Sequence, residues 1–188
     1  MALPIIALIL DDVEDAIAAI STDAGYQVNV SSVYRQSTVN GMERLPPGPY
    51  VVQMTSDDPV RMEELDIFGA EPCIGWMQPV ELGLIIRPSD TSTTPIDTAL
   101  NQFWADVVRA VMADPQWSQR AIDTTVGAPQ DWTGPNGEVG RTAIMQISYR
   151  VKEADPYQLP ANPAGWTAII DCGNAATTDY TAIIEGNQ

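Results

Sequence analysis

The chain has 188 residues, 45% of them apolar, which is enough for one domain with a sizeable core. Its 25 acidic and 9 basic residues give a net charge of −16, which disfavours a protein that grips nucleic acid or an anionic membrane. The absence of histidine excludes Ser-His-Asp and Cys-His catalysis and most zinc sites, so the composition favours a non-enzymatic protein.

Neither the apolar runs nor the cysteines indicate secretion or a membrane. The longest apolar run, residues 3–10, is followed by Asp11 and Asp12 and lacks the basic region of a signal peptide. Cys73 and Cys172 form no motif; we interpret them as two buried apolar side chains, with a single bridge as the alternative. We expect a soluble protein made in a cytoplasm, without a membrane partner.

Apolar residues at helical spacing predict a first helix that starts near Pro4 and ends at Gly25. The apolar stripe consists of Ile6, Ile9, Leu10, Val13, Ala16, Ile17 and Ile20. From residue 26 the period changes to two, which predicts a strand over 26–30 that continues to Arg35. A second strand is predicted over 50–55.

The middle of the chain is less regular. Around Met62, Leu65 and Phe68 the pattern fits either a short helical turn or a bulging loop. Alternating apolar residues then predict a strand over 80–86, and the apolar side chain of Ile85 indicates that its second face is covered as well.

A second helix is predicted to begin with Thr94 as its cap and Pro95 in the first position, and to end before Asp114-Pro115. Its apolar stripe consists of Ile96, Leu100, Phe103, Val107 and Val111. We expect Phe103 and Val107 to face the sheet, where Ile147 and Tyr149 are among the residues that receive them.

The third quarter of the chain adds a possible strand over 120–126 and a loop over 127–140, which is rich in glycine and proline. The clearest strand follows over 143–151, and its length predicts a central position in the sheet. This order predicts an α+β domain: a mixed, largely antiparallel sheet packed with two main helices.

The character of the sequence changes after Lys152. Prolines lead into a segment with no basic residue, in which a short phrase occurs twice, at Trp166-Thr-Ala-Ile-Ile and Tyr180-Thr-Ala-Ile-Ile. We therefore divide the chain into a domain of residues 1–157 and an extension of residues 158–188 with two short strands. Trp166, Tyr180, Ile169 and Ile183 are the candidate interface residues, and a plain local hairpin is the alternative.

No motif indicates chemistry. No glycine loop follows a strand in the manner of a phosphate site, and the adjacent acids lack the spacing of a calcium loop. The sequence therefore predicts no catalytic residue, no metal ligand and no cofactor.

The order of elements and several short phrases resemble the tail terminator and minor tail proteins of long-tailed bacteriophages over residues 3–157. In that family helices often close on a Leu-or-Ala, Asp, Pro phrase, and the last core strand often ends in Tyr-Arg. The phrases that carry the resemblance are Gly25-Tyr26, Ser32-Val33-Tyr34-Arg35, Leu45-Pro46-Pro47, Ala113-Asp114-Pro115 and Ile147-Ser148-Tyr149-Arg150. The doubled phrase in the extension has no counterpart in the family.

The resemblance implies a compact α+β protomer in a homohexameric ring on the last ring of the tail tube. Such a ring stops tube elongation, contacts the major tail tube protein and provides the interface to the head connector and neck proteins. It has no active site or cofactor, and genome DNA passes through it without specific binding. The implied location is the tail or neck of a virion assembled in the host cytoplasm.

Three other interpretations stay open. A different neck, head-completion or minor tail ring would have a similar sequence. An acidic DNA mimic would carry its acids regularly spaced over one face, whereas here they are scattered among ordinary elements. A hydrolase that uses carboxylates would need a substrate or a metal to reveal it.

Overall fold

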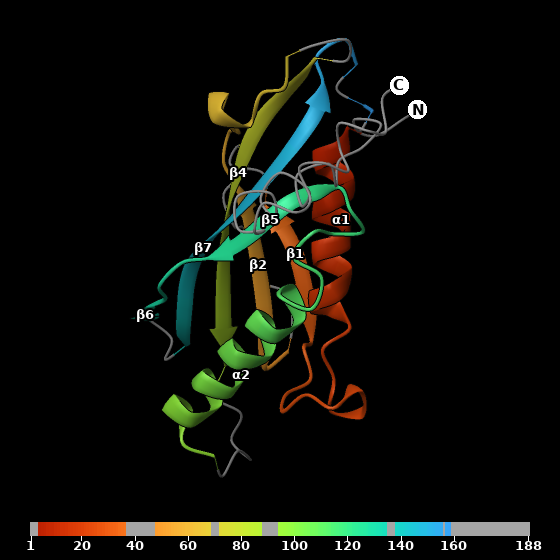
Figure 1. The fold of residues 1–188 in the computed structure, drawn as a ribbon. Coiled ribbons are helices and arrows are strands. Elements are labelled where there is room, and N and C mark those ends of the chain that lie inside the picture. Colours follow the sequence, from red (N-terminus) through yellow and green to blue (C-terminus); the bar gives the residue numbers. More distant parts are fainter. Residues whose placement is uncertain are drawn as a thin grey trace, which may run out of the picture.

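The computed structural model describes residues 4–36, 48–68, 72–87, 94–134, 138–155 and 157–158, which form a seven-stranded mixed sheet and two α-helices (Figure 1). The helices are α1 (Ile5–Ala18) and α2 (Ile96–Val111), with short 3-10 turns η1 (Thr22–Ala24) and η2 (Glu63–Leu65). The strands are β1 (Ser32–Gln36), β2 (Tyr50–Ser56), β3 (Val60–Arg61), β4 (Cys73–Ile86), β5 (Ala121–Val126), β6 (Gln130–Thr133) and β7 (Val139–Lys152). The predicted α+β class is confirmed.

The sheet is organised around β4 and β7, which pair antiparallel along their whole length, from Cys73↔Lys152 to Ile86↔Val139. The main path has the order β1-β2-β4-β7-β5, with β3 added to β4 and β6 added to β7. Among the strands that the structure describes, β1 and β2 are parallel and all other pairs are antiparallel. The prediction of a long central strand near the end of the domain is confirmed, because β7 has neighbours on both sides.

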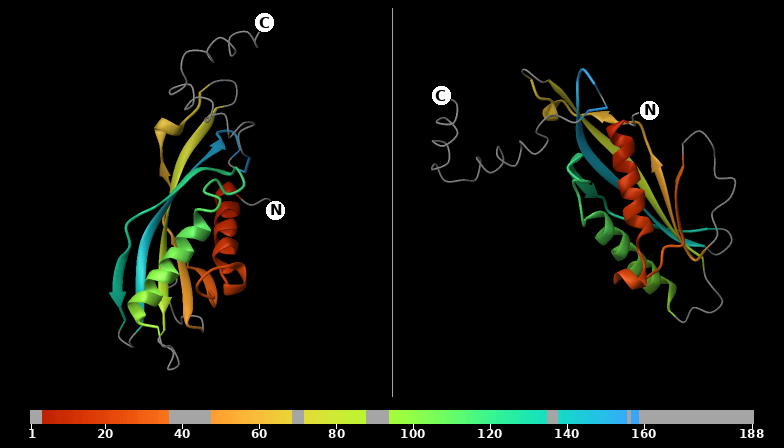
Figure 2. Two further views of the ribbon diagram at one scale, coloured as in Figure 1. Left: turned by 60° about the horizontal axis from the view of Figure 1, so that its bottom comes forward. Right: turned by 90° about the vertical axis from the view of Figure 1, so that its right-hand side faces the viewer.

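Both helices cover the same face of the sheet (Figure 2) and share one core with it. Phe103 and Val107 of α2 are fully buried in a cluster that includes Ile147 and Tyr149, as predicted. The ring of Phe103 meets that of Tyr50 edge to face, with 5.2 Å between centroids. Burial of these apolar stripes is what orients the helices on the sheet.

The first helix also follows its predicted stripe, with one shift. The buried residues are Ile5, Ile9, Leu10, Val13 and Ile17 of α1, and Ile20 just beyond it. Ile6 and Ala16 are only partly buried at the edge of the core. The buried stripe therefore begins one residue earlier than predicted. The predicted end of the helix at Gly25 is wrong, because α1 ends at Ala18 and Gly25 instead closes the 3-10 turn η1 in a left-handed conformation.

The predicted strand over residues 26–30 is wrong. Of the strand predicted over 26–35, only the continuation is found, as β1, which begins at Ser32. The backbone N–H groups of Gln27 and Val28 donate to the buried carboxylate of Asp106 on α2 instead of to a neighbouring strand. Tyr26 stacks against the guanidinium of Arg109, 4.8 Å from the ring centre. These contacts hold the segment against α2 rather than in the sheet.

Other predicted boundaries also change. Residues 73–79, left open between a turn and a loop, form the first half of β4, and the predicted loop over 127–140 contains β6. Helix α2 begins one residue later than expected, with Pro95 as its N-cap and no side-chain capping bond from Thr94. The prediction that Ile85 is covered on the second face of the sheet is confirmed, because this residue is buried.

Candidate interaction surface

One end of the β4–β7 pair carries a group of exposed apolar side chains. Strand β7 pairs with the whole of β4 on one side. On the other side, β2 pairs with residues 80–86 of β4, and the short strand β3 and the η2 turn lie beside the first half, among the residues described. Figure 1 shows this end of the two strands on the far side of the molecule from α2. We call it the tip, and its exposed apolar residues are Val60, Ile67, Phe68 and Tyr157.

Phe68 is the most exposed of these residues, with 85% of its surface accessible to solvent. It directly follows Ile67, whose backbone exchanges two hydrogen bonds of 3.0 Å with Cys73 at the start of β4. The backbone beside Phe68 is therefore held against the sheet. An aromatic side chain that projects from a fixed backbone loses little conformational entropy on binding, which makes it a suitable anchor for a partner.

A buried carboxylate, that of Asp66, stabilises the tip. Its carboxylate is only 4% exposed and accepts hydrogen bonds of 2.8 Å from the guanidinium of Arg61 and from the backbone N–H of Gly75. The hydrogen bond from Arg61 is the largest cause that holds the pKa of Asp66 below its usual value, followed by the bond from Gly75. The same carboxylate thus joins β3, η2 and β4.

Close packing between η2 and β4 also stabilises the tip. A Cβ atom on Gly75 would lie 2.2 Å from the Cβ of Leu65, so only glycine allows this approach. The buried side chain of Arg150, on β7, donates from Nε to the carbonyl oxygen of Leu65. Burial lowers the pKa of Arg150 from its ordinary value. The η2 turn therefore has contacts to both long strands.

A second feature lies on the face of the sheet that α1 and α2 do not cover. It occurs where the pairing along β7 passes from β5 to β6. Strand β5 ends at Val126 and β6 begins at Gln130; of the three residues between them, Gly127 still donates a hydrogen bond of 2.9 Å to the carbonyl oxygen of Ile144 on β7. A pocket of about 420 Å³ opens there, which we call the notch. Its lining residues are Glu81, Gly127, Ala128, Gln130, Thr142, Ala143 and Ile144.

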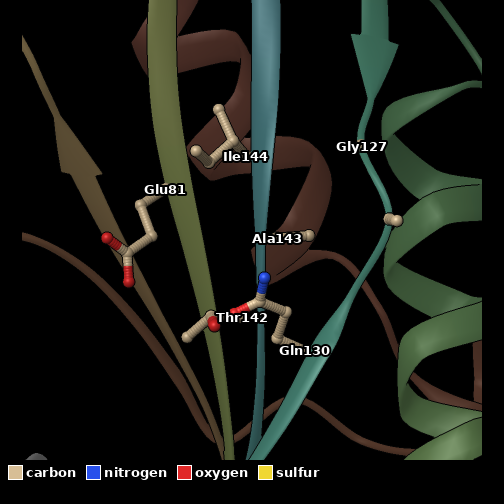
Figure 3. A pocket seen from close by; sticks show the side chains of 7 residues that line it. Glu81, Gly127, Gln130, Thr142, Ala143 and Ile144 are labelled. Carbon is tan, nitrogen blue, oxygen red and sulfur yellow. The ribbon is translucent and has the colours of Figure 1, made fainter.

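The notch combines apolar surface with one carboxylate. Figure 3 shows Ile144 and Glu81 projecting from adjacent strands, with Gly127 on the connection beside them. Ile144 is 53% exposed, although it lies in the middle of a central strand. Glu81 pairs with it across the two strands and is exposed. The notch thus combines the apolar side chain of Ile144 with the polar side chains of Gln130 and Thr142 and the carboxylate of Glu81.

The tip and the notch differ from the interface residues that the sequence predicted. Trp166, Ile169, Tyr180 and Ile183 lie outside the described residues, as does almost all of the extension 158–188. The sequence did carry a signal for the notch. Along residues 143–151 apolar and polar side chains alternate, and Ile144 is an apolar residue at one of the polar positions. It carried none for the exposure of Phe68, which depends on contacts between distant segments.

The arginines that the structure describes are mostly engaged within the protein. Four of them pair with carboxylates: Arg35 with Asp11 and Glu14, Arg61 with Asp66, Arg120 with Asp12, and Arg141 with Asp131. Arg109 donates to the carbonyl of Gly25 at 3.0 Å, and Arg150 contacts Leu65. The exposed acids that have no arginine partner therefore make the outer surface negative, and its electrostatic field repels phosphate.

No group of three or more His, Cys, Asp or Glu side chains is arranged to hold a metal ion in the part of the chain that the structure describes. None of the helices described is long and apolar enough to cross a membrane.

No protein-family model matches the chain, and no curated protein matches its sequence. Among solved structures, it is similar to the sheath/tube terminator of an extracellular contractile injection system, PVC, determined by cryo-EM in the extended state. The identity is 11% and the TM-score 0.38, over 81% of this chain and 59% of that chain. This chain thus spans less than two thirds of its neighbour, and a likeness at this level does not assign a function.

Proposed function

We propose that the protein is a non-enzymatic structural component of a phage tail, a terminator that forms a hexameric ring on the tail tube. In this role it stops tube elongation, contacts the major tail tube protein and presents a face to the head connector. The sequence resemblance over residues 3–157 is the first support. The mixed sheet packed with two helices is consistent with the α+β protomer that this resemblance implies.

The use of the arginines is the structural observation that carries the proposal. A ring through which DNA passes must not retain phosphate, and free guanidinium groups would retain it. Here Arg35, Arg61, Arg120 and Arg141 are neutralised by carboxylates of the same chain. With a net charge of −16, the surface supports passage of DNA without binding. The same property argues against a duplex-binding role.

Tail length provides the functional test. Deletion of the gene from its phage should give tubes of uncontrolled length without heads, and added protein should restore a single length and joining to heads. Tails of normal length after deletion would contradict the terminator role. If length stays normal while heads fail to join, the protein belongs to another ring of the neck.

A further inference from the structure

The chain between α2 and β5 contains three consecutive residues with a left-handed backbone. Trp117, Ser118 and Gln119 have φ angles of 48°, 57° and 67°. An L-amino acid loses stability in this conformation, which residues other than glycine adopt singly rather than in a run. We infer that residues 117–119 form a strained hinge, which is left-handed in the free protein and relaxes when the protein docks on the tail tube.

Asp114, just beyond the end of α2, holds the start of the hinge. Its carboxylate accepts hydrogen bonds from the backbone N–H groups of Gln116, at 3.3 Å, and Ser118, at 2.7 Å. Its carbonyl oxygen accepts a third bond, of 3.1 Å, from the N–H of Trp117. One residue thus satisfies three backbone donors, and these bonds offset part of the strain.

Trp117 fixes the inner side of the hinge. It is only 3% exposed, and its indole Nε1 donates a hydrogen bond of 2.8 Å to the hydroxyl of Thr124 on β5. That hydroxyl in turn donates a bond of 2.7 Å to the carbonyl oxygen of Pro115. Directly after the hinge, Arg120 pairs with Asp12 of α1. The hinge therefore lies between fixed points on α1, α2 and β5, so a change in its shape moves these elements relative to one another.

The outer side of the hinge has no comparable anchor. Ser118 and Gln119 are exposed, and neither side chain forms a hydrogen bond among the residues that the structure describes. Glycine at either position would therefore remove the backbone strain without the loss of an internal contact. Packing of the domain thus does not explain why strained residues occupy these two positions.

Strain of this kind makes a hinge easy to shift. A partner changes a conformation only through the difference in its affinity for the two forms, and a smaller gap between the forms needs a smaller difference. The left-handed backbone raises the energy of the observed form, so the gap to a relaxed form is reduced. Under the proposed function, on which this inference rests, the partner is the tube that the protein caps.

Paired glycine and alanine substitutions isolate the strain. Ser118→Gly with Gln119→Gly removes the cost of the left-handed backbone, whereas Ser118→Ala with Gln119→Ala keeps it, and both pairs lose the same polar groups. The glycine pair should melt roughly 3–6 °C above the alanine pair. In the free protein, amide hydrogen exchange at residues 116–121 should be several-fold slower in the glycine pair, with no difference over residues 103–111 of α2.

The tail-length assay shows whether docking uses the strain. The alanine pair should restore a single tail length at concentrations near those of the wild type, because it keeps the strained backbone. The glycine pair should require several-fold more protein, because its left-handed form is no longer raised in energy. Equal activity of the two pairs, or a glycine pair that melts no higher than the alanine pair, would overturn the inference.

Failure of the hinge and failure of the proposed function give different results. If the wild type controls tail length and the two pairs match it equally, the terminator role stands and the relaxation on docking is wrong. If the wild-type protein has no effect on tail length, the terminator role is wrong, and with it the tube as the partner. The differences in melting and in hydrogen exchange would then still establish the strain in the free protein.

Discussion

The carboxylate of Asp106 accepts a hydrogen bond of 3.0 Å from the backbone N–H of Val28, which is 78 residues earlier in the chain. The same oxygen accepts a second bond of 2.7 Å from Gln27. Asp106 is 4% exposed, so these two donors replace the water that the carboxylate loses on burial. One side chain of α2 thereby fixes the path of the chain between α1 and the sheet.

Asp106→Ala should therefore destabilise the protein, because it leaves two backbone N–H groups without their acceptor. We expect a loss of about 2–3 kcal/mol in the free energy of unfolding, measured by urea denaturation. Asp97→Ala, in the exposed first turn of the same helix, is the control and should cost less than about 1 kcal/mol. Equal losses for the two variants would contradict the role assigned to Asp106.

Truncation of Phe103 tests the packing of α2 on the sheet. The side chain is fully buried and meets Tyr50 edge to face, so Phe103→Ala should cost roughly 3–5 kcal/mol in urea melts. Met112→Ala, at the exposed C-terminal end of α2, should cost much less. A loss below about 1 kcal/mol for Phe103→Ala would show that another face of the helix packs on the sheet.

Two glycines of β4 give opposite predictions for the same substitution. Gly75→Ala places a methyl group 2.2 Å from the Cβ of Leu65, which forces η2 away from the strand and should cost about 1–3 kcal/mol. At Gly83 the new methyl group would meet no atom closer than 3.6 Å, so Gly83→Ala should be neutral or slightly stabilising. Thermal melts measure both, and hydrogen exchange at residues 60–68 should increase only in Gly75→Ala.

The bond between Asp66 and Arg61 predicts a dependence on pH. The pKa of Asp66 in the folded state is lower than the unfolded value, so its stabilising effect is present above the unfolded pKa and is lost as pH falls through the folded pKa. Wild type should therefore be more stable than Asp66→Asn at pH near 7, and this gap should narrow in strong acid. Urea melts across that range measure it; a gap that widens towards acid would contradict the bond.

The elements that follow a local pattern were predicted well, and those that depend on distant partners were not. The apolar stripes of α1 and α2 and the alternation of β7 reflect which side chains are buried, so the sequence predicts these elements and their buried faces, although α1 ends earlier than predicted, at Ala18. The segment at Val28 alternates like a strand, but its backbone donors bind Asp106, which no local pattern reveals. Likewise, β6 occupies a glycine-rich stretch because Trp132 packs over Gly140, where a Cβ would lie 2.2 Å from the ring.

The surfaces were harder to predict than the fold for the same reason. The sequence around Phe68 fits either a short helical turn or a bulging loop. The position of this residue depends on the contacts that Asp66 and Leu65 make with Gly75 of β4. The notch lies between the part of β7 that pairs with β5 and the part that pairs with β6. Its position therefore depends on how three strands pair. Such features follow from tertiary contacts rather than from period or composition.

The extension stays a prediction that truncation can test. The carbonyl of Gln158 accepts a bond of 3.2 Å from the N–H of Lys152, so a chain ending after Gln158 keeps this contact. If residues 159–188 form an interface arm anchored by Trp166 and Tyr180, the truncated protein should keep its thermal midpoint but fail to complete tails. A truncated protein that unfolds, or one that supports normal tails, would contradict the arm.

A cryo-EM map of the assembled tail tests the central claim most directly. We predict one ring of six copies of this chain at the end of the tail tube, between the last tube ring and the head connector. The wall of the ring's channel should be acidic. A map in which the chain is a dimer, or belongs to no ring at the end of the tube, would contradict the account.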